Sequence, residues 1–298
     1  MSSRSYDVQV DWISFLLKVA KPSNGWSVKR VFDQWSNRKQ HTRPVRPGPG
    51  GAADLFLVRL QEPPALRGLN AFVQANWPGA VTQIVGIEVA FDTYIGGTPV
   101  LELAQALTEQ FFWMQYRSND YWYFYRIPGE GRAYVHTSDM SRLEMSKRFM
   151  AQWQLTDQPN KFRLIRFHLH LKTTDAGQLP LPQQLWRARF EVTLKRGSVP
   201  WTSLADLIRA NFAKGLRQFF QFRRAKPSLH RTLAWPIASP GFPVGFQPGR
   251  QGAYPTPAAT PRAKPLRRRK FRAMSSADTT FNAKIYDALR HLRGTRDP

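Results

Sequence analysis

The sequence contains no cysteine among its 298 residues. This absence excludes a disulfide-stabilised fold, a thiolate zinc site, an iron–sulfur centre and a cysteine nucleophile, and it suits a protein of the cytoplasm. Acidic residues are also scarce, because 20 Asp and Glu stand against 44 Lys and Arg, giving a formal net charge of +24. Such an imbalance is typical of proteins that bind a polyanion, and nucleic acid is the partner we expect.

Long hydrophobic segments are lacking as well. No stretch approaches about 18 uninterrupted apolar residues, and the N-terminus MSSRSYDVQVDW has no apolar core of a secretory signal. We therefore expect neither export nor a membrane partner. Hydrophobic residues nevertheless make up 42% of the chain and aromatic residues 13%, which is enough for most of it to form a packed core.

The positive charge is concentrated towards the C-terminus. The stretch 209–298 holds 19 Lys and Arg but three acidic residues, so it carries 16 of the 24 net charges. Eight prolines between residues 234 and 270 preclude regular structure there. We expect three parts, which are a folded domain over 1–228, a disordered Pro-rich basic linker over 229–275 and a short basic helix over 276–298.

The helices and strands expected in the first part alternate along the chain. Start signals predict helices after Pro99, Ser141 and Ser203, the last one running through residues 204–220, and residues 41–54 are expected to form an internal loop. Strict period-two alternation predicts strands over 84–92, 163–172 and 186–196, and a hairpin over 121–136. This order favours an α+β fold, with an antiparallel or mixed sheet that has helices on one face and an open polar face.

Acids, histidines and cations occupy the polar phase of these strands. Since side chains at i and i+2 share one face of a sheet, the open face is expected to carry a set of chemically active residues. They are Glu88, Asp92, His168, His170, Lys172, Arg187, Arg189, Glu191 and Lys195. Carboxylates with imidazoles suit Mg²⁺ or Mn²⁺, so we predict Glu88, Asp92, His168, His170 and Glu191 as metal residues. The same pattern is also typical of a solvated strand face with Glu191 as a salt-bridge partner.

At these residues the sequence resembles the rolling-circle replication initiator proteins of plasmids and filamentous phages. The likeness runs from about Val8 to Arg224 and rests on VQVDWISF, IEVAFD, RFHLHLK and RARFEVTLK. It implies a protein that binds partly single-stranded origin DNA, works with host replication proteins, and cuts one strand through a tyrosine with the help of a divalent metal. The family pattern implies a tyrosine at position 170, where this sequence has His170.

That departure leaves two interpretations open. Either the histidine pair binds metal and the tyrosine lies elsewhere, or the protein binds the origin without cutting it. The catalytic candidates are Tyr123, Tyr125, Tyr286 and Lys172, although a long flexible linker before Tyr286 argues against fixed placement of that residue.

The residues expected to contact DNA are basic side chains of the sheet and of the C-terminal third. They are Arg187, Arg189, Lys195, Arg223, Arg224, Arg267, Arg268, Arg269 and Lys270. The alternative functions are a DNA-binding replication or regulatory protein without nicking activity, and a single-stranded RNA-binding protein whose aromatic residues stack on bases.

Overall fold

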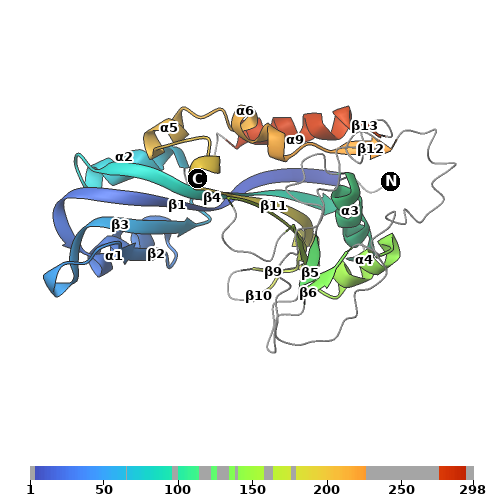
Figure 1. Cartoon of the computed structure of the whole chain (residues 1–298), viewed down its shortest axis with the longest axis horizontal. Coiled ribbons are helices and arrows are strands. Elements are labelled where there is room, and N and C mark those ends of the chain that lie inside the picture. Colours follow the sequence, from blue (N-terminus) through green and yellow to red (C-terminus); the bar gives the residue numbers. More distant parts are fainter. Residues whose placement is uncertain are drawn as a thin grey trace, which may run out of the picture.

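A nine-stranded sheet forms the centre of the computed structural model of the chain (Figure 1). Its strand order is β2-β3-β1-β4-β11-β8-β7-β5-β6, and every neighbouring pair is antiparallel. The structure describes residues 4–64, 66–95, 100–113, 122–125, 134–137, 140–157, 164–175, 179–225 and 275–292. The predicted linker, including Arg267, Arg268, Arg269 and Lys270, lies outside these residues.

The strands of the sheet differ greatly in length. The central strands β1 and β4 have 21 and 15 residues, whereas the edge strands β2 and β6 have 4 and 3. The strands are β1 (Arg4–Asn24), β2 (His41–Pro44), β3 (Ala52–Gln61), β4 (Val81–Ile95), β5 (Tyr123–Tyr125), β6 (Tyr134–His136), β7 (Gln154–Thr156), β8 (Ile165–Lys172) and β11 (Arg187–Lys195). Two small separate ribbons pair β9 (Thr174–Asp175) with β10 (Leu179–Pro180), and β12 (Arg223–Ala225) with β13 (Ser275–Ala277).

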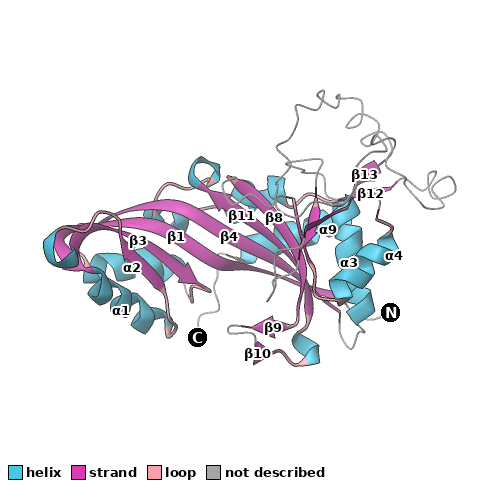
Figure 2. Cartoon of the chain, turned by 60° about the horizontal axis from the view of Figure 1, so that its bottom comes forward, coloured by secondary structure: helices cyan, strands magenta, loops and turns pink. Residues whose placement is uncertain are grey.

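One face of the sheet is apolar in the neighbouring strands β1, β4, β11, β8, β7, β5 and β6. A single cross-strand row passes through Val135, Phe124, Leu155, Leu169, Phe190, Phe91 and Val8. Helices cover this face (Figure 2). They are α1 (Gly25–Ser36), α2 (Leu66–Asn76), α3 (Val100–Trp113), α4 (Arg142–Met150), α5 (Leu204–Ile208), α6 (Phe212–Leu216) and α9 (Thr279–His291). The expectation of an α+β fold with helices on one face of the sheet and an open polar face on the other is confirmed.

Aromatic contacts join the helices to the apolar face. The ring centroid of Phe281 on α9 lies 5.6 Å from that of Phe91, and Phe32 on α1 lies 5.9 Å from Phe15. Edge-to-face pairs of this kind stabilise cores beyond the area they bury. The C-terminal helix α9 therefore packs against the sheet, a contact that the sequence did not predict.

Two local expectations need correction. The stretch 204–220 is not one helix, since α5 ends at Ile208 and the side chain of Asn211 accepts a hydrogen bond from the backbone N–H of Lys214, which starts α6 as a new helix. The stretch 41–54 is not wholly a loop, because β2 lies within it and pairs with β3. The turn of the expected hairpin lies outside the described residues.

In the described part of the chain, we find no helix that is both long and apolar enough to span a membrane.

Candidate metal centre on the open sheet face

The pairing of β4, β11 and β8 brings the predicted acidic and histidine residues to one face. Glu191 on β11 stands opposite Ala90 on β4 and opposite His168 on β8. Glu88 pairs with Thr193 in the next row along the same face. Because the side-chain period of a strand is two, Glu88, Asp92, His168, His170 and Glu191 all project from the polar face.

A further carboxylate reaches this face from a β-bulge in β1. The register of β1 against β4 shifts between Val10 and Trp12, which leaves Asp11 as the extra residue. Bulges re-aim a side chain and occur often beside active sites. The sequence analysis did not select Asp11, although the apolar phase of VQVDWISFLL changes at this residue, after Val10 and before Ile13, which is the signal of a bulge.

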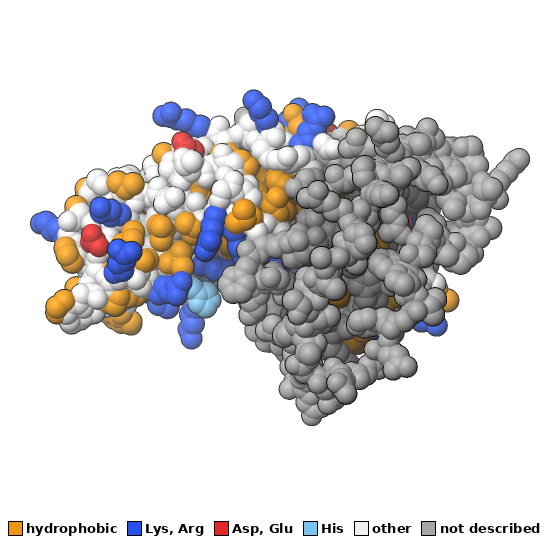
Figure 3. Space-filling model, in the orientation of Figure 1, with side chains coloured by type: hydrophobic (Ala, Val, Ile, Leu, Met, Phe, Trp, Pro, Cys, Tyr) orange, Lys and Arg blue, Asp and Glu red, His pale blue; other side chains and the backbone are white. Residues whose placement is uncertain are grey.

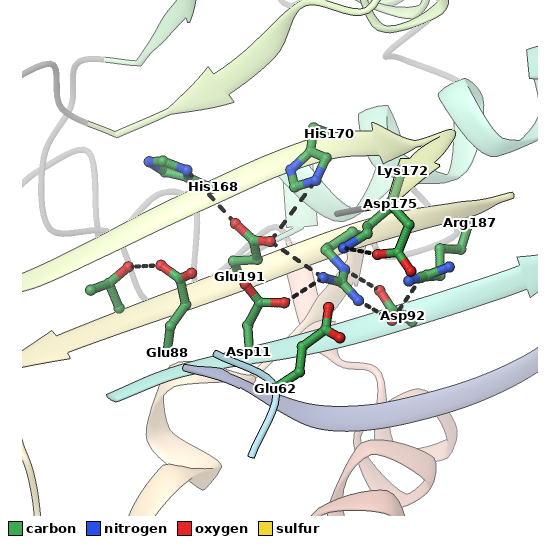
Figure 4. Close-up of polar contacts among 12 residues, drawn as sticks. Asp11, Glu62, Glu88, Asp92, His168, His170, Lys172, Asp175, Arg187 and Glu191 are labelled. Atoms are coloured by element: carbon green, nitrogen blue, oxygen red, sulfur yellow. Dashed lines mark hydrogen bonds and ion pairs between the residues drawn. The ribbon is translucent and has the colours of Figure 1, made fainter. Parts of the chain in front are cut away.

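Three carboxylates meet at the centre of the polar face (Figure 4). Ligand atoms of Asp11, Glu88 and Glu191, which come from three adjacent strands, all lie within 4.8 Å of one another. Glu191 is only 7% exposed. Three oxygen donors so close together, one on a buried and two on half-buried residues, form a group that could hold a divalent cation.

The electrostatics of this group favour binding of a cation. Burial raises the pKa of Glu191 well above its usual range, and the nearby charge of Glu88 raises it further. Burial also raises the pKa of Glu88, although a hydrogen bond from the hydroxyl of Thr193 partly offsets this shift. Without a positive ion, the protein therefore disfavours full ionisation of the three carboxyls.

Both histidines face Glu191 (Figure 4). His168 Nδ1 lies 3.8 Å from Oε2 of Glu191, and His170 Nε2 lies 3.9 Å from Oε1. Burial lowers the pKa of His168 well below its usual value and that of His170 to about 3, so both imidazoles are neutral near pH 7. The remaining ring nitrogens, Nε2 of His168 and Nδ1 of His170, are buried and hydrogen-bond to no described residue.

Asp92, predicted with the metal residues, is held by arginines. Arg189 donates to both of its carboxylate oxygens, at 2.8 and 2.7 Å, and Arg187 Nε lies 3.0 Å from Oδ2. Asp92 and Arg189 are both fully buried. The structure thus puts Asp11 in the carboxylate group and Asp92 in an adjacent ion-pair network. We expected Arg189 to contact DNA, but its guanidinium is enclosed by Asp92 and Asp11.

The candidate tyrosines lie at different distances from the centre. Tyr125 is beside the histidines, since its ring centroid is 6.0 Å from that of His168, and its hydroxyl donates a 2.6 Å hydrogen bond to Oε1 of Gln154. Tyr123 shares the polar phase of β5 with it. Tyr286 lies on α9, the helix that packs on the opposite face of the sheet.

The remaining predicted residues of the described part of the chain lie on β8, β11 and β12. Lys172 Nζ lies 3.6 Å from Oδ1 of Asp175, and Lys195 is half-buried at the end of β11. Arg223 and Arg224 belong to β12. The catalytic role of Lys172 and the DNA contacts of Lys195, Arg223 and Arg224 stay predictions.

Comparisons with known proteins give a weak structural likeness. No protein-family model matches the sequence, and no curated protein matches it significantly. Among solved structures, the chain is similar to a rolling circle replication initiator protein from Geobacillus stearothermophilus, with a TM-score of 0.37 and 14% sequence identity. The likeness covers 78% of this chain and 92% of that one. A TM-score of this size does not by itself establish a shared fold, so function has to be inferred from the residues of the site.

Proposed function

We propose that this protein binds replication-origin DNA and cuts one strand at the carboxylate centre, with a divalent metal ion and a tyrosine nucleophile. The observation that carries the proposal is the meeting of Asp11, Glu88 and Glu191, whose ligand atoms lie within 4.8 Å of one another. The origin and the host replication proteins enter the proposal through the sequence resemblance to rolling-circle initiators.

The donor set fits Mg²⁺ or Mn²⁺. Asp11, Glu88 and Glu191 would supply oxygen ligands, which both ions prefer, and His168 and His170 would add neutral imidazole nitrogens, which favour Mn²⁺ over Mg²⁺. The ring nitrogens that face this group are Nδ1 of His168 and Nε2 of His170, at 3.8 and 3.9 Å from the carboxylate oxygens of Glu191. When bound, such an ion would neutralise charge that develops on a phosphodiester during cleavage.

Tyr125 is the nucleophile that the geometry favours, because it lies beside His168 on the polar side of β5. In the proposed reaction its phenol oxygen forms a bond to the phosphorus of one phosphodiester and the P–O bond to the neighbouring nucleotide breaks. The phenol proton is released to solvent, and the leaving oxygen takes up a proton to become a free hydroxyl. The cut strand then stays joined to the protein by a phosphotyrosine link.

The charge of the protein supports DNA as the substrate. The net charge is +24, and on the described part of the face shown in Figure 3 Lys and Arg side chains outnumber acidic ones. Neutralisation of phosphates by such side chains releases counterions and supplies affinity without sequence preference.

The proposal is tested by incubating the protein with supercoiled plasmid carrying its origin and separating nicked circles on a gel. We expect nicking with Mn²⁺ or Mg²⁺ and none with EDTA. Asp11→Asn should reduce nicking at least about 100-fold, because the substitution keeps the shape and removes the ligand charge. Asp7→Asn is the matched control, since Asp7 is an exposed residue on the same strand.

Tyr125 is tested in the same assay by labelling the DNA and boiling the products in detergent. Wild-type protein should retain covalently linked label, and Tyr125→Phe should retain none while still binding DNA. Tyr94→Phe serves as the control on the polar face. Metal-independent nicking, or full activity of Asp11→Asn, would contradict the metal proposal; absence of nicking under any metal would favour the alternative of an origin-binding protein without cleavage.

A further inference from the structure

Three cations gather on the open sheet face beside Glu88. Lys195 on β11 stands opposite Gly86 on β4, Gly86 opposite Ser14 on β1, and Ser14 opposite Arg59 on β3, so one row crosses four strands. Arg166 on β8 is in the neighbouring row, paired with Thr193, which in turn pairs with Glu88. We call Arg59, Arg166 and Lys195 the basic cluster.

The floor of the basic cluster is the indole ring of Trp12. The guanidinium carbon of Arg59 lies 4.1 Å from the ring centroid, a cation–π contact that fixes the arginine over the ring. Gly86 makes room below, because a Cβ there would lie 3.0 Å from the ring. Trp12 also hydrogen-bonds Glu88, so a single buried side chain positions Arg59 relative to the carboxylate centre.

Two members of the basic cluster, Arg59 and Arg166, each keep a buried donor unused among the described residues. The Nε atoms of Arg59 and Arg166 are buried and hydrogen-bond to no described residue. Burial lowers the pKa of Arg59 and of Lys195, and the charges of Arg166 and Arg59 lower that of Lys195 further. Half-buried arginines that each keep a donor unused, beside a lysine of the same charge, are suited to an external anion.

We propose, building on the proposed function, that Arg59, Arg166 and Lys195 bind a backbone phosphate of a single DNA strand that continues from the carboxylate centre. Glu191 and Lys195 are four residues apart on one strand and face, which is a separation of about 13 Å. The DNA strand would thus run along β11, from Glu191 towards Lys195.

The depth at which the three basic side chains lie, close to the sheet surface, favours single-stranded DNA over a duplex as the ligand. All three members of the basic cluster are half-buried, so they lie close to the sheet surface. An unpaired strand can follow this surface and place its bases on apolar side chains, and half-buried Leu16 and Leu57 face each other at the same side of β1 and β3. A duplex is stiff and offers its phosphates on a convex surface.

The test is fluorescence anisotropy with a labelled 20-nucleotide single strand, the same sequence as duplex DNA, and the same sequence as RNA, all in EDTA. The double variant Arg166→Gln/Lys195→Gln should bind single-stranded DNA at least about tenfold more weakly than wild type, since each charged hydrogen bond contributes on this scale. The charge-matched control Arg209→Gln/Lys214→Gln changes exposed residues at the end of α5 and within α6, and should lose less than about threefold.

A conservative variant separates charge from folding. Arg166→Lys/Lys195→Arg should keep most of the affinity, and thermal unfolding should show that all variants are folded. Equal losses in the basic-cluster and control variants, or equal losses on duplex and single strand, would overturn the proposal, as would tighter binding of RNA than of DNA. Because EDTA removes the metal, this outcome is independent of whether the carboxylate centre cuts DNA.

Discussion

Asp11 and Arg189 are 178 residues apart in the sequence, yet Nη1 of Arg189 donates a 2.8 Å hydrogen bond to Oδ1 of Asp11. The same guanidinium donates hydrogen bonds to both carboxylate oxygens of Asp92, and its Nη1 lies 3.7 Å from Oε1 of Glu191. Neighbouring carboxylates raise the pKa of Arg189 despite its burial, so it stays charged. The arginine thus orients one carboxylate of the centre and offsets part of its negative charge.

Replacement of Arg189 should destabilise the fold strongly. Arg189→Met leaves Asp92 buried without its bidentate partner, and breaking a buried pair in this way typically costs about 3–5 kcal/mol. Urea unfolding followed by circular dichroism measures the loss. Arg196→Met, at an exposed position just after β11, should stay within about 0.5 kcal/mol of wild type. Similar small losses in both variants would show that the network is not structurally important.

Metal binding should strengthen as the pH rises. Because the pKa of Glu191 is raised, the folded protein keeps this proton above the pH at which the unfolded chain loses it. Metal-free protein therefore loses stability as the pH rises from the ordinary carboxyl pKa through the raised one, and a divalent ion, which must displace the proton, reverses the loss.

Thermal unfolding with and without Mn²⁺ at pH 6 and pH 8 checks this expectation. At an ion concentration about 100 times the Kd measured at pH 6, the ion should stabilise the protein by about 2.7 kcal/mol at that pH. The same concentration should give a larger gain at pH 8, because the Kd is lower there. Glu191→Gln should abolish the gain, while Glu102→Gln, at an exposed position on α3, should leave it unchanged. A gain that is equal at both pH values would argue against the raised pKa.

The C-terminal helix should contribute to global stability. Ile285 on α9 is 1% exposed, so Ile285→Ala should lower the free energy of unfolding by about 2–5 kcal/mol. Lys284→Ala, at the adjacent exposed position, should have little effect. If urea unfolding gives equal values for both variants, α9 does not pack on the sheet in solution.

The basic run in the linker should act as an electrostatic arm. Changing Arg267, Arg268, Arg269 and Lys270 to glutamine in the full chain removes four charges and should reduce the slope of log affinity against log salt by up to about 3 for single-stranded DNA. Anisotropy titrations between 50 and 300 mM salt measure the slope. An unchanged slope would mean that these residues do not contact phosphates.

Much of the sheet was predictable because its strands have two distinct faces. The alternation in 163–172 and 186–196 places His168, His170 and Glu191 on the polar face, and the structure has them there. The burial of Phe167 and Phe190 on the other face confirms the phase. Period-two patterns carry this information because one face packs against helices and the other does not.

The parts that could not be predicted depend on contacts distant in the sequence. Asp11 enters the centre through a bulge, and the change of apolar phase at this residue does not say which carboxylates of other strands it will meet. The pairing of Asp92 with Arg189 follows from register across two strands, which alternation alone does not specify. The packing of α9 on β1 connects segments separated by the whole linker, where neither spacing nor composition indicates a contact.

The most direct test of the central claim is a calorimetric titration of Mn²⁺ into wild-type protein and into the Asp11→Asn and Asp7→Asn variants at pH 8. If Asp11, Glu88 and Glu191 hold the ion, wild type and Asp7→Asn should bind one Mn²⁺ with similar affinity, and Asp11→Asn should bind at least about tenfold more weakly. Equal affinity in all three proteins, or no Mn²⁺ binding by the wild type, would contradict the account.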